Sequence, residues 1–174
     1  FDYTFNWAKT YDETLYRLFD ADKQKAVAIL NIDRENTKPR KDIAKWSEVL
    51  DYVSYFYNET YKENYTLPEN IAPEDAAVIA SEYKKIFDVT DDKQVWFDKI
   101  KAMCEPLGFT PNVKEYKQNP GSYKGHVGDV STVIRIALTG RTNTPDLHSI
   151  IAVLGADEVK ARLEKAEKKF KEEK

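Results

Sequence analysis

Residues that usually build metal centres and disulfides are scarce in this sequence. It holds one cysteine, Cys104, and two histidines, His126 and His148. The three fall on separate predicted elements without ligand spacing, which excludes a zinc-type site, and a single thiol cannot form an internal disulfide. We therefore expect no metal and no cofactor in this chain, and a reducing compartment, the cytoplasm.

Signatures of catalysis are missing as well. Lys124-Gly125 with Gly128 is too sparse for a phosphate-binding loop and lacks the Lys-Ser/Thr pair that follows in such loops. Cys104 sits on the apolar side of its predicted helix, as a buried and inert thiol would. The acidic pairs Glu74-Asp75 and Asp91-Asp92 fall at predicted helix starts, where they complement the helix dipole. No catalytic residue is predicted.

Long apolar stretches are also absent. No run of about 18 apolar residues occurs, so we expect no membrane span, and the first residues do not resemble a signal peptide. The chain opens FDYTFNW without methionine, from which we expect a fragment of a longer protein.

No segment shows the alternating pattern of a β-strand, and no internal repeat occurs. Apolar residues instead recur at helical spacing along most of the chain. The pattern predicts an all-α fold of two packed helical subdomains, with a break near Val89. The expected helices cover residues 6–19, 26–30, 43–57, 74–87, 91–107, 130–138, 145–154 and 157–170.

Polar residues, proline and glycine set the expected helix ends. Four polar residues are placed to cap the helices that follow them: Asp42, Thr90, Asp129 and Thr144. Pro73 and Pro145 stand near first helical positions, where proline is favoured. Three glycines are placed to take the left-handed conformation beyond a helix end: Gly108, Gly140 and Gly155.

The charge is unevenly distributed. The chain carries a net charge of -3, which argues against a generally basic nucleic-acid coat. Between residues 110 and 145, five basic residues face two acidic ones, so this window carries +3. The residues are Lys114, Lys117, Lys124, Arg135 and Arg141 against Glu115 and Asp129. Two interpretations stay open here, a local binding patch or an ordinary fluctuation of surface charge.

Tyrosine is abundant between residues 52 and 65. Such rings can stack on bases, but at helical spacing they more often form core with a solvated hydroxyl edge, and we favour the second interpretation.

The segment GHVGDVSTVIRIALTGRTNTPDL, residues 125–147, resembles the last-domain signature of bacterial glutamyl-tRNA synthetases, which are class I enzymes. That signature is a helix-turn-helix with ALTG, a short loop and T-P-x-L. The matching positions are Gly128, Arg135, Ala137, Leu138, Thr139, Gly140, Pro145 and Leu147. KPRKDIAKWSEV, residues 38–49, and the tyrosine-rich run after it are also similar to that family.

The resemblance covers the anticodon-binding region of such an enzyme and not its catalytic half. Neither the His-Ile-Gly-His nor the Lys-Met-Ser-Lys-Ser motif occurs, and Gly125-His126-Val127-Gly128 has the wrong order for the first. The resemblance implies a parent glutamate–tRNA ligase that uses ATP, with magnesium, in a catalytic domain missing here, so this chain should be inactive alone. It further implies three parts: 1–40, the end of the stem-contact region, and the helical anticodon-binding subdomains 41–89 and 90–174.

The resemblance also implies the binding residues and the partner. Arg135, Thr144, Pro145 and Leu147 would lie at the anticodon loop of glutamate tRNA. Independently of the resemblance, Arg135 falls off the apolar stripe of its predicted helix, so we expect its head to reach solvent. Other basic residues would contribute to tRNA binding: Arg141, Lys38, Arg40 and Lys41. Thr144 and Pro145 could equally cap a helix, and Leu147 could be pure core. We expect a monomer, and we assign no residue to the third anticodon base, which leaves open whether glutamine tRNA is also a substrate.

Two alternatives stay open. One is the related helical anticodon domain of a class I lysyl-tRNA synthetase. Bacterial glutaminyl enzymes fit less well, because members of that family end in β-barrels and no strand pattern occurs in this sequence. The other is a helical protein-interaction module with no RNA role. RNA binding requires basic residues to share one face, and scattered charges would favour the interaction module. The residues concerned are Lys38, Arg40, Lys41, Arg135 and Arg141, or a subset of them.

Overall fold

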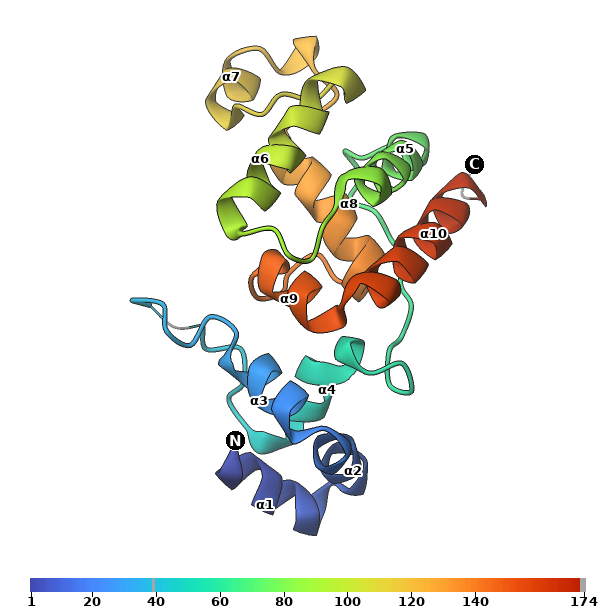
Figure 1. Cartoon of the computed structure of the whole chain (residues 1–174). Coiled ribbons are helices and arrows are strands. Elements are labelled where there is room, and N and C mark those ends of the chain that lie inside the picture. Colours follow the sequence, from blue (N-terminus) through green and yellow to red (C-terminus); the bar gives the residue numbers. More distant parts are fainter. Residues whose placement is uncertain (39, 173–174) are drawn as a thin grey trace. The chain divides into compact units, whose positions relative to one another are not determined.

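The computed structural model describes residues 1–38 and 40–172, and helices joined by loops make up this part of the chain (Figure 1). It contains ten α-helices: α1 (Asp2–Tyr11), α2 (Glu13–Ala21), α3 (Lys23–Asn31), α4 (Val49–Val53), α5 (Pro73–Ile86), α6 (Lys93–Cys104), α7 (Val113–Gln118), α8 (Val127–Thr139), α9 (Leu147–Leu154) and α10 (Ala156–Glu172). Four single 3-10 turns accompany them: η1 (Trp46–Glu48), η2 (Ser54–Phe56), η3 (Glu105–Leu107) and η4 (Pro120–Ser122). The described residues form no strand, only one isolated bridge between Thr110 and His126, so the all-α prediction is confirmed.

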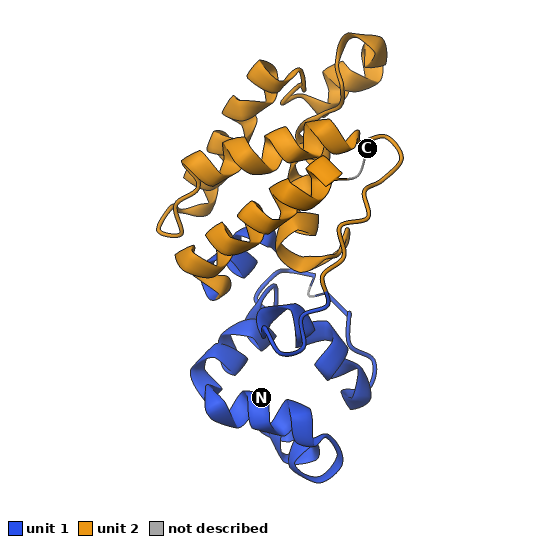
Figure 2. Ribbon diagram, turned by 90° about the vertical axis from the view of Figure 1, so that its right-hand side faces the viewer, with its two compact units in different colours: residues 1–62, 145–153 blue, residues 63–144, 154–174 orange. Residues whose placement is uncertain are grey.

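Two compact units make up the chain, and each is continuous in space but not in sequence (Figure 2). Unit 1 comprises Phe1–Lys62 and Pro145–Val153, and unit 2 comprises Glu63–Thr144 and Leu154–Lys174. Helix α9 therefore belongs to unit 1, although both of its neighbours in sequence belong to unit 2. These units describe packing; the division by function into 1–40, 41–89 and 90–174 stays a prediction.

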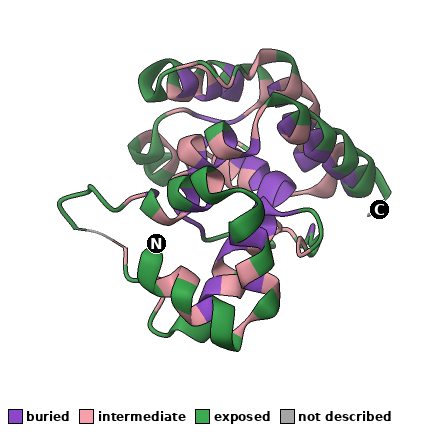
Figure 3. Cartoon of the chain, turned by 60° about the horizontal axis from the view of Figure 1, so that its bottom comes forward, coloured by how far each residue is buried: buried purple, intermediate pink, exposed green. Residues whose placement is uncertain are grey.

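Unit 2 is built on three helices, with α5 packed along α10 and both in contact with α8. Helix α8 is the most buried of the three, because it carries apolar residues on nearly all of its sides. Eight of its residues are buried: Val127, Val130, Val133, Ile134, Ile136, Ala137, Leu138 and Thr139. In Figure 3 buried residues run in stripes along the helices, with exposed residues opposite, as amphipathic helices require.

In unit 1, α2 contacts α1, α3 and α4. Its buried stripe is Leu15, Leu18 and Phe19. Within the described part of the chain, no helix combines the length and apolar character needed to cross a bilayer.

Three glycines and one of the two prolines marked helix ends correctly. Gly108, Gly140 and Gly155 have φ of 84°, 69° and 79°, and each follows the end of a helical segment. Pro73 is the first residue of α5, where its missing N–H would have had no helical partner.

The predicted helix over residues 6–19 is wrong in one respect, because the structure divides it at Asp12. This residue has φ −146° and ψ 86°, and its carboxylate accepts a hydrogen bond from the Leu15 N–H at 3.0 Å. Asp12 therefore ends α1 and caps α2, a role that its place inside an apolar pattern concealed.

Two predicted caps are also wrong. Asp42 caps no helix but binds Arg40, and the helix expected over residues 43–57 shrinks to η1, α4 and η2. Thr90 is displaced as a cap by Asp92, which accepts from the N–H groups of Gln94 and Val95. One carboxylate oxygen of Asp92, Oδ1, accepts from both orphan N–H groups at 2.9 Å, and this places the cap two residues after Thr90.

Candidate nucleic-acid interface

The first turn of α8 is fixed by a reciprocal cap. The Gly128 N–H donates to Nδ1 of His126 at 2.9 Å, while the His126 N–H donates to Oδ2 of Asp129 at 2.8 Å. Asp129 is therefore the third helical residue and not the cap, and α8 begins at Val127, three residues earlier than predicted. His126 is the capping residue itself.

The other end of α8 is held by side chains as well as by Gly140. The Thr139 hydroxyl donates to the Arg135 carbonyl at 2.7 Å, and the Arg141 N–H donates to that hydroxyl at 3.2 Å. From α10, Nη1 of Arg162 donates to the Leu138 carbonyl at 2.6 Å. Two of the last four carbonyls of the helix are thus satisfied within unit 2, that of Ile136 by the Gly140 N–H and that of Leu138 by Arg162.

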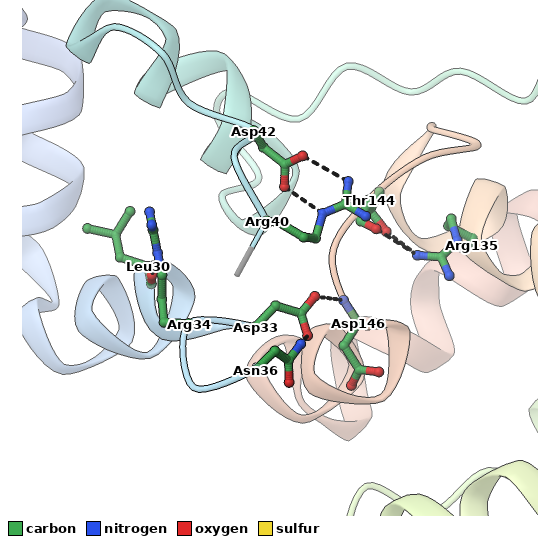
Figure 4. Close-up of polar contacts among 9 residues, drawn as sticks. All are labelled: Leu30, Asp33, Arg34, Asn36, Arg40, Asp42, Arg135, Thr144 and Asp146. Atoms are coloured by element: carbon green, nitrogen blue, oxygen red, sulfur yellow. Dashed lines mark hydrogen bonds and ion pairs between the residues drawn. The ribbon is translucent and has the colours of Figure 1, made fainter. Parts of the chain in front are cut away.

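Arg135 and Thr144 are joined directly. Nη1 of Arg135 donates to the Thr144 hydroxyl oxygen across the loop that follows α8 (Figure 4). Thr144 is only 6% exposed, and Arg135 is half-buried. The expectation that the Arg135 head reaches solvent freely is therefore corrected: part of its donor set holds the end of the loop in place.

The apex between these two residues presents polar groups outward. Thr142 and Asn143 are exposed, and Arg141 is half-buried. An amide, a hydroxyl and a guanidinium are the groups that hydrogen-bond to the edges of unpaired bases. Their backbone is anchored at Thr139 on one side and at Thr144 on the other, so the apex is a short loop clamped at both ends.

The start of α9, in unit 1, corrects a further prediction. Helix α9 begins at Leu147, so Thr144 is not its cap and Pro145 is not its first residue. Asp146 takes the capping position: its Oδ2 accepts from the Ser149 N–H at 3.0 Å and from the Ser149 hydroxyl at 2.8 Å. Pro145 is buried, and Leu147 is 2% exposed.

Asp33 anchors the same turn within unit 1. Its Oδ2 accepts from the Asp146 N–H at 2.9 Å, and its Oδ1 accepts from Nδ2 of Asn36 at 2.9 Å (Figure 4). Asp33 has φ 62°, the one positive φ outside glycine among the described residues, a conformation that aspartate tolerates better than most residues. The loop after α3 therefore supports the beginning of α9.

The predicted residues Lys38, Arg40 and Lys41 lie on this loop of unit 1. Lys38 and Lys41 are exposed. Arg40 is half-buried and pairs with Asp42 through two bonds, Nε to Oδ2 at 2.6 Å and Nη2 to Oδ1 at 2.9 Å (Figure 4). The hydrogen bond to Asp42 raises the pKa of Arg40, so Arg40 stays charged beside the carboxylate of Asp42.

The structure thus joins Arg135 to Thr144 and places Arg141 between them in unit 2, and it groups Lys38, Arg40 and Lys41 on one loop of unit 1. Sequence reasoning missed Asp33, Asp146 and Arg162. A signal existed only for Arg162, which falls on the α10 stripe between Val159 and Ala166.

Comparison with known proteins bears on this arrangement. Residues 122–167 match the model of the family described as "Anticodon binding domain". The match begins before α8 and includes α9 and most of α10, so it contains the clamped apex. It does not contain the loop with Lys38, Arg40 and Lys41.

Longer matches come from curated glutamate–tRNA ligases. The chain is 36% identical to that of Acetivibrio thermocellus over 165 residues, 39% identical to one from Clostridium perfringens over 169, and 41% identical to that of Clostridium beijerinckii over 170. Each match covers 95% of this chain. The chain spans only 30% to 31% of the length of these relatives. With a clamped helix-turn-helix inside the matched domain and a resemblance that runs along nearly its whole length, the chain belongs to the anticodon-binding regions of the glutamate–tRNA ligase family.

Proposed function

We propose that this chain binds the anticodon loop of glutamate tRNA for a parent enzyme that attaches glutamate to that tRNA using ATP. In this proposal ATP and its magnesium ion belong to a catalytic domain outside the chain. The observation that carries the proposal is the clamped apex of residues 141–144, which lies within the match to the anticodon-binding family. The names of the relatives favour the glutamate enzyme over the lysyl enzyme and over a module without an RNA role.

Reading an anticodon requires unpaired bases to meet polar edges and stacking planes. We propose that Thr142 and Asn143, which are exposed, supply polar edges and that Arg141 supplies a guanidinium plane. Arg135 has two roles in this proposal. It holds Thr144, and its half-buried guanidinium either pairs with an RNA phosphate or stacks on a base.

Pro145 and Leu147 receive a different role in the proposal. Both are buried, so we assign them to the packing of unit 1 and not to contacting a base. Lys38, Arg40 and Lys41 would neutralise phosphates elsewhere on the tRNA, with Arg40 weakest because Asp42 already binds it.

Titration against stem-loops tests this function. The chain should bind a stem-loop carrying the glutamate anticodon more tightly than the same stem with its anticodon bases exchanged. Affinity should also fall with salt, since each phosphate contact releases counterions. Equal affinity for both stem-loops would overturn anticodon reading, and no binding to either or to whole tRNA would overturn the function.

Inactivity of the chain alone also belongs to this proposal. No glutamate-dependent pyrophosphate exchange should exceed a buffer control, since neither ATP-binding motif occurs in the sequence. A monomer in the cytoplasm stays the expected state, and sedimentation of the purified chain measures the first of these.

A further inference from the structure

A pocket that lies wholly within unit 1 combines apolar, aromatic and basic side chains of the kinds that contact RNA. The pocket has a volume of about 500 Å³, in the range of small-ligand sites, about 300–1000 Å³. Leu30, Ile43 and Val49 contribute apolar walls, and Arg34, Lys45 and Trp46 bring two cations and an indole ring.

Trp46 is the unexpected member of this pocket. The apolar pattern of residues 43–57 places it in the core, yet 49% of its surface is exposed. It rests against Trp7, with ring centroids 6.1 Å apart and an interplanar angle of 43°. A large ring that contacts a second ring and keeps half of its surface exposed can serve as a platform on which another flat group stacks.

The turn that carries Trp46 is preorganised. The Glu48 carboxylate accepts hydrogen bonds from the N–H groups of Ala44 at 2.9 Å and Lys45 at 3.2 Å. These backbone bonds lower the pKa of Glu48, so the carboxylate stays ionised and occupied with the backbone. The side chains of Trp46 and Lys45, which line the pocket, therefore project from a turn whose backbone is held in place.

Charge at the pocket favours an anion. The Nε of Arg34 donates to the Leu30 carbonyl at 3.1 Å, and both residues are drawn in Figure 4. Arg34 lines the pocket, so this bond restrains its guanidinium there. Residues 34–48 include five basic and three acidic side chains, a net +2 in a chain of net -3. One acid, Asp42, is bound by Arg40 and another, Glu48, by the backbone, while Arg34 and Lys45 are both exposed.

We propose that this pocket takes an unstacked nucleotide of the bound RNA, with the base on Trp46 and the phosphate against Arg34 and Lys45. The inference rests on the proposed function, because it presumes that the chain binds RNA. An aromatic platform beside cations is how proteins hold single-stranded nucleotides, and every base offers a face to stack. An acidic peptide would use the cations but would gain nothing from the ring.

Substitutions at Trp46 test the stacking. Trp46→Ala should weaken binding of whole tRNA by roughly 5- to 150-fold, the usual range for one base stacked on a ring. Trp46→Phe keeps a ring and should stay within about threefold of the parent. Tyr3→Ala is the matched control, because Tyr3 is 83% exposed in the same unit and outside the pocket lining. If Phe bound as weakly as Ala while both variants melted normally, stacking would be refuted.

Arg34→Ala tests the phosphate. It should reduce the slope of log affinity against log salt by about 0.7 to 0.9, the share of one contact. Lys9→Ala, an exposed change on α1, should leave the slope unaltered. Unchanged tRNA binding by both Trp46→Ala and Arg34→Ala would overturn the inference and would favour a protein segment as the occupant of the pocket.

The NMR signals of the tryptophan indole N–H groups report on direct contact with RNA, which a purely structural role of Trp46 would not produce. On addition of tRNA the Trp46 signal should shift, while that of Trp96, buried and bonded to the Tyr83 hydroxyl at 3.0 Å, should not. Trp46→Phe assigns the signal. If the chain binds tRNA but the Trp46 signal does not shift, the nucleotide pocket is refuted and the proposed function stands. If the chain binds no tRNA, the proposed function itself is refuted.

Discussion

Arg162 reaches from α10 to the carbonyl of Leu138, 24 residues earlier, at 2.6 Å, and its Nε binds Oε1 of Glu158 at 2.6 Å. The side chain is 5% exposed. A buried cation is tolerated here because one partner is an ionised carboxylate and the other is a helix-terminal carbonyl, where the dipole is negative. The end of α8, and with it the clamped apex, thus depends on a residue of α10.

Arg162→Ala should lower the free energy of unfolding by about 2–4 kcal/mol, since it removes two charge-assisted bonds and leaves buried acceptors unmatched. Urea titration followed by circular dichroism measures the change. Lys160→Ala, an exposed neighbour on α10, should stay within about 0.5 kcal/mol. Equal midpoints for the two variants would show that Arg162 is not a structural member of unit 2.

Arg135→Ala should affect both stability and RNA binding. Loss of the bond to Thr144 should cost about 1–2 kcal/mol of stability, because the pair is half-buried. Affinity for a glutamate stem-loop should fall by roughly 1–3 kcal/mol if the guanidinium stacks on a base. Thr144→Val separates the two effects, since it breaks the same bond but keeps the guanidinium. A Thr144→Val protein that binds as weakly as Arg135→Ala would mean that Arg135 acts only by holding the loop.

Leu147→Ala should destabilise the protein by about 2–5 kcal/mol, the usual cost of a cavity at a site that is 2% exposed. Thermal melting gives the shift. Val95→Ala is the matched control, because Val95 is 44% exposed on α6 and its truncation should change little. A Leu147→Ala protein that melts normally but no longer discriminates between anticodons would return Leu147 to the contact surface.

Stability should fall in acid through Glu167. Hydrogen bonds from Lys171 and Lys84 lower the pKa of Glu167 below its ordinary 4.5, with Lys171 at 2.6 Å and Lys84 at 3.1 Å. Because the folded state holds the ionised form, this contribution is complete above about pH 4.5 and is lost as pH falls through the lowered pKa. Glu167→Gln should therefore be less stable than the parent at pH 7 and should lose less stability on going to pH 3. Parallel curves for the two proteins would exclude this carboxylate as the cause.

Cys104 should react slowly with thiol reagents. Burial raises its pKa to about 11, so almost none of it is thiolate at pH 8, and its side chain is fully covered. Release of a coloured thiol from an aromatic disulfide should be slow in buffer and fast in 6 M urea, where the protein unfolds. Rapid reaction in buffer would mean that α6 opens locally.

Sequence patterns predicted this fold well where one residue sets a backbone angle by itself. Gly108, Gly140 and Gly155 ended helices as expected, because no neighbour competes for a left-handed position. Caps were less predictable. Asp92 displaced Thr90, and Asp146 displaced Thr144, since several adjacent polar residues can satisfy the same orphan N–H groups and only tertiary packing selects one.

The candidate site shows the same division. Arg135, Arg141 and Thr144 could be selected from the sequence, but the bond between Arg135 and Thr144 spans a loop whose path no periodicity encodes. Asp33 supports α9 across 113 positions, a separation at which sequence patterns carry no information about contact. Trp46 was assigned to a helical stripe that the structure breaks into short turns, and this break is what exposes its ring.

The order in which the chain is made gives the membership of α9 in unit 1 a further meaning. Residues 1–62 leave the ribosome before residues 145–153, and unit 1 is complete only when both segments are present. A growing chain folds domain by domain from its N-terminus. Unit 1 therefore stays incomplete, with most of α9 missing, until residues 145–153 have been synthesised. Helix α10 follows, so unit 2 is completed later still, and a ribosome stalled before residue 145 should display a unit 1 that proteases still cut.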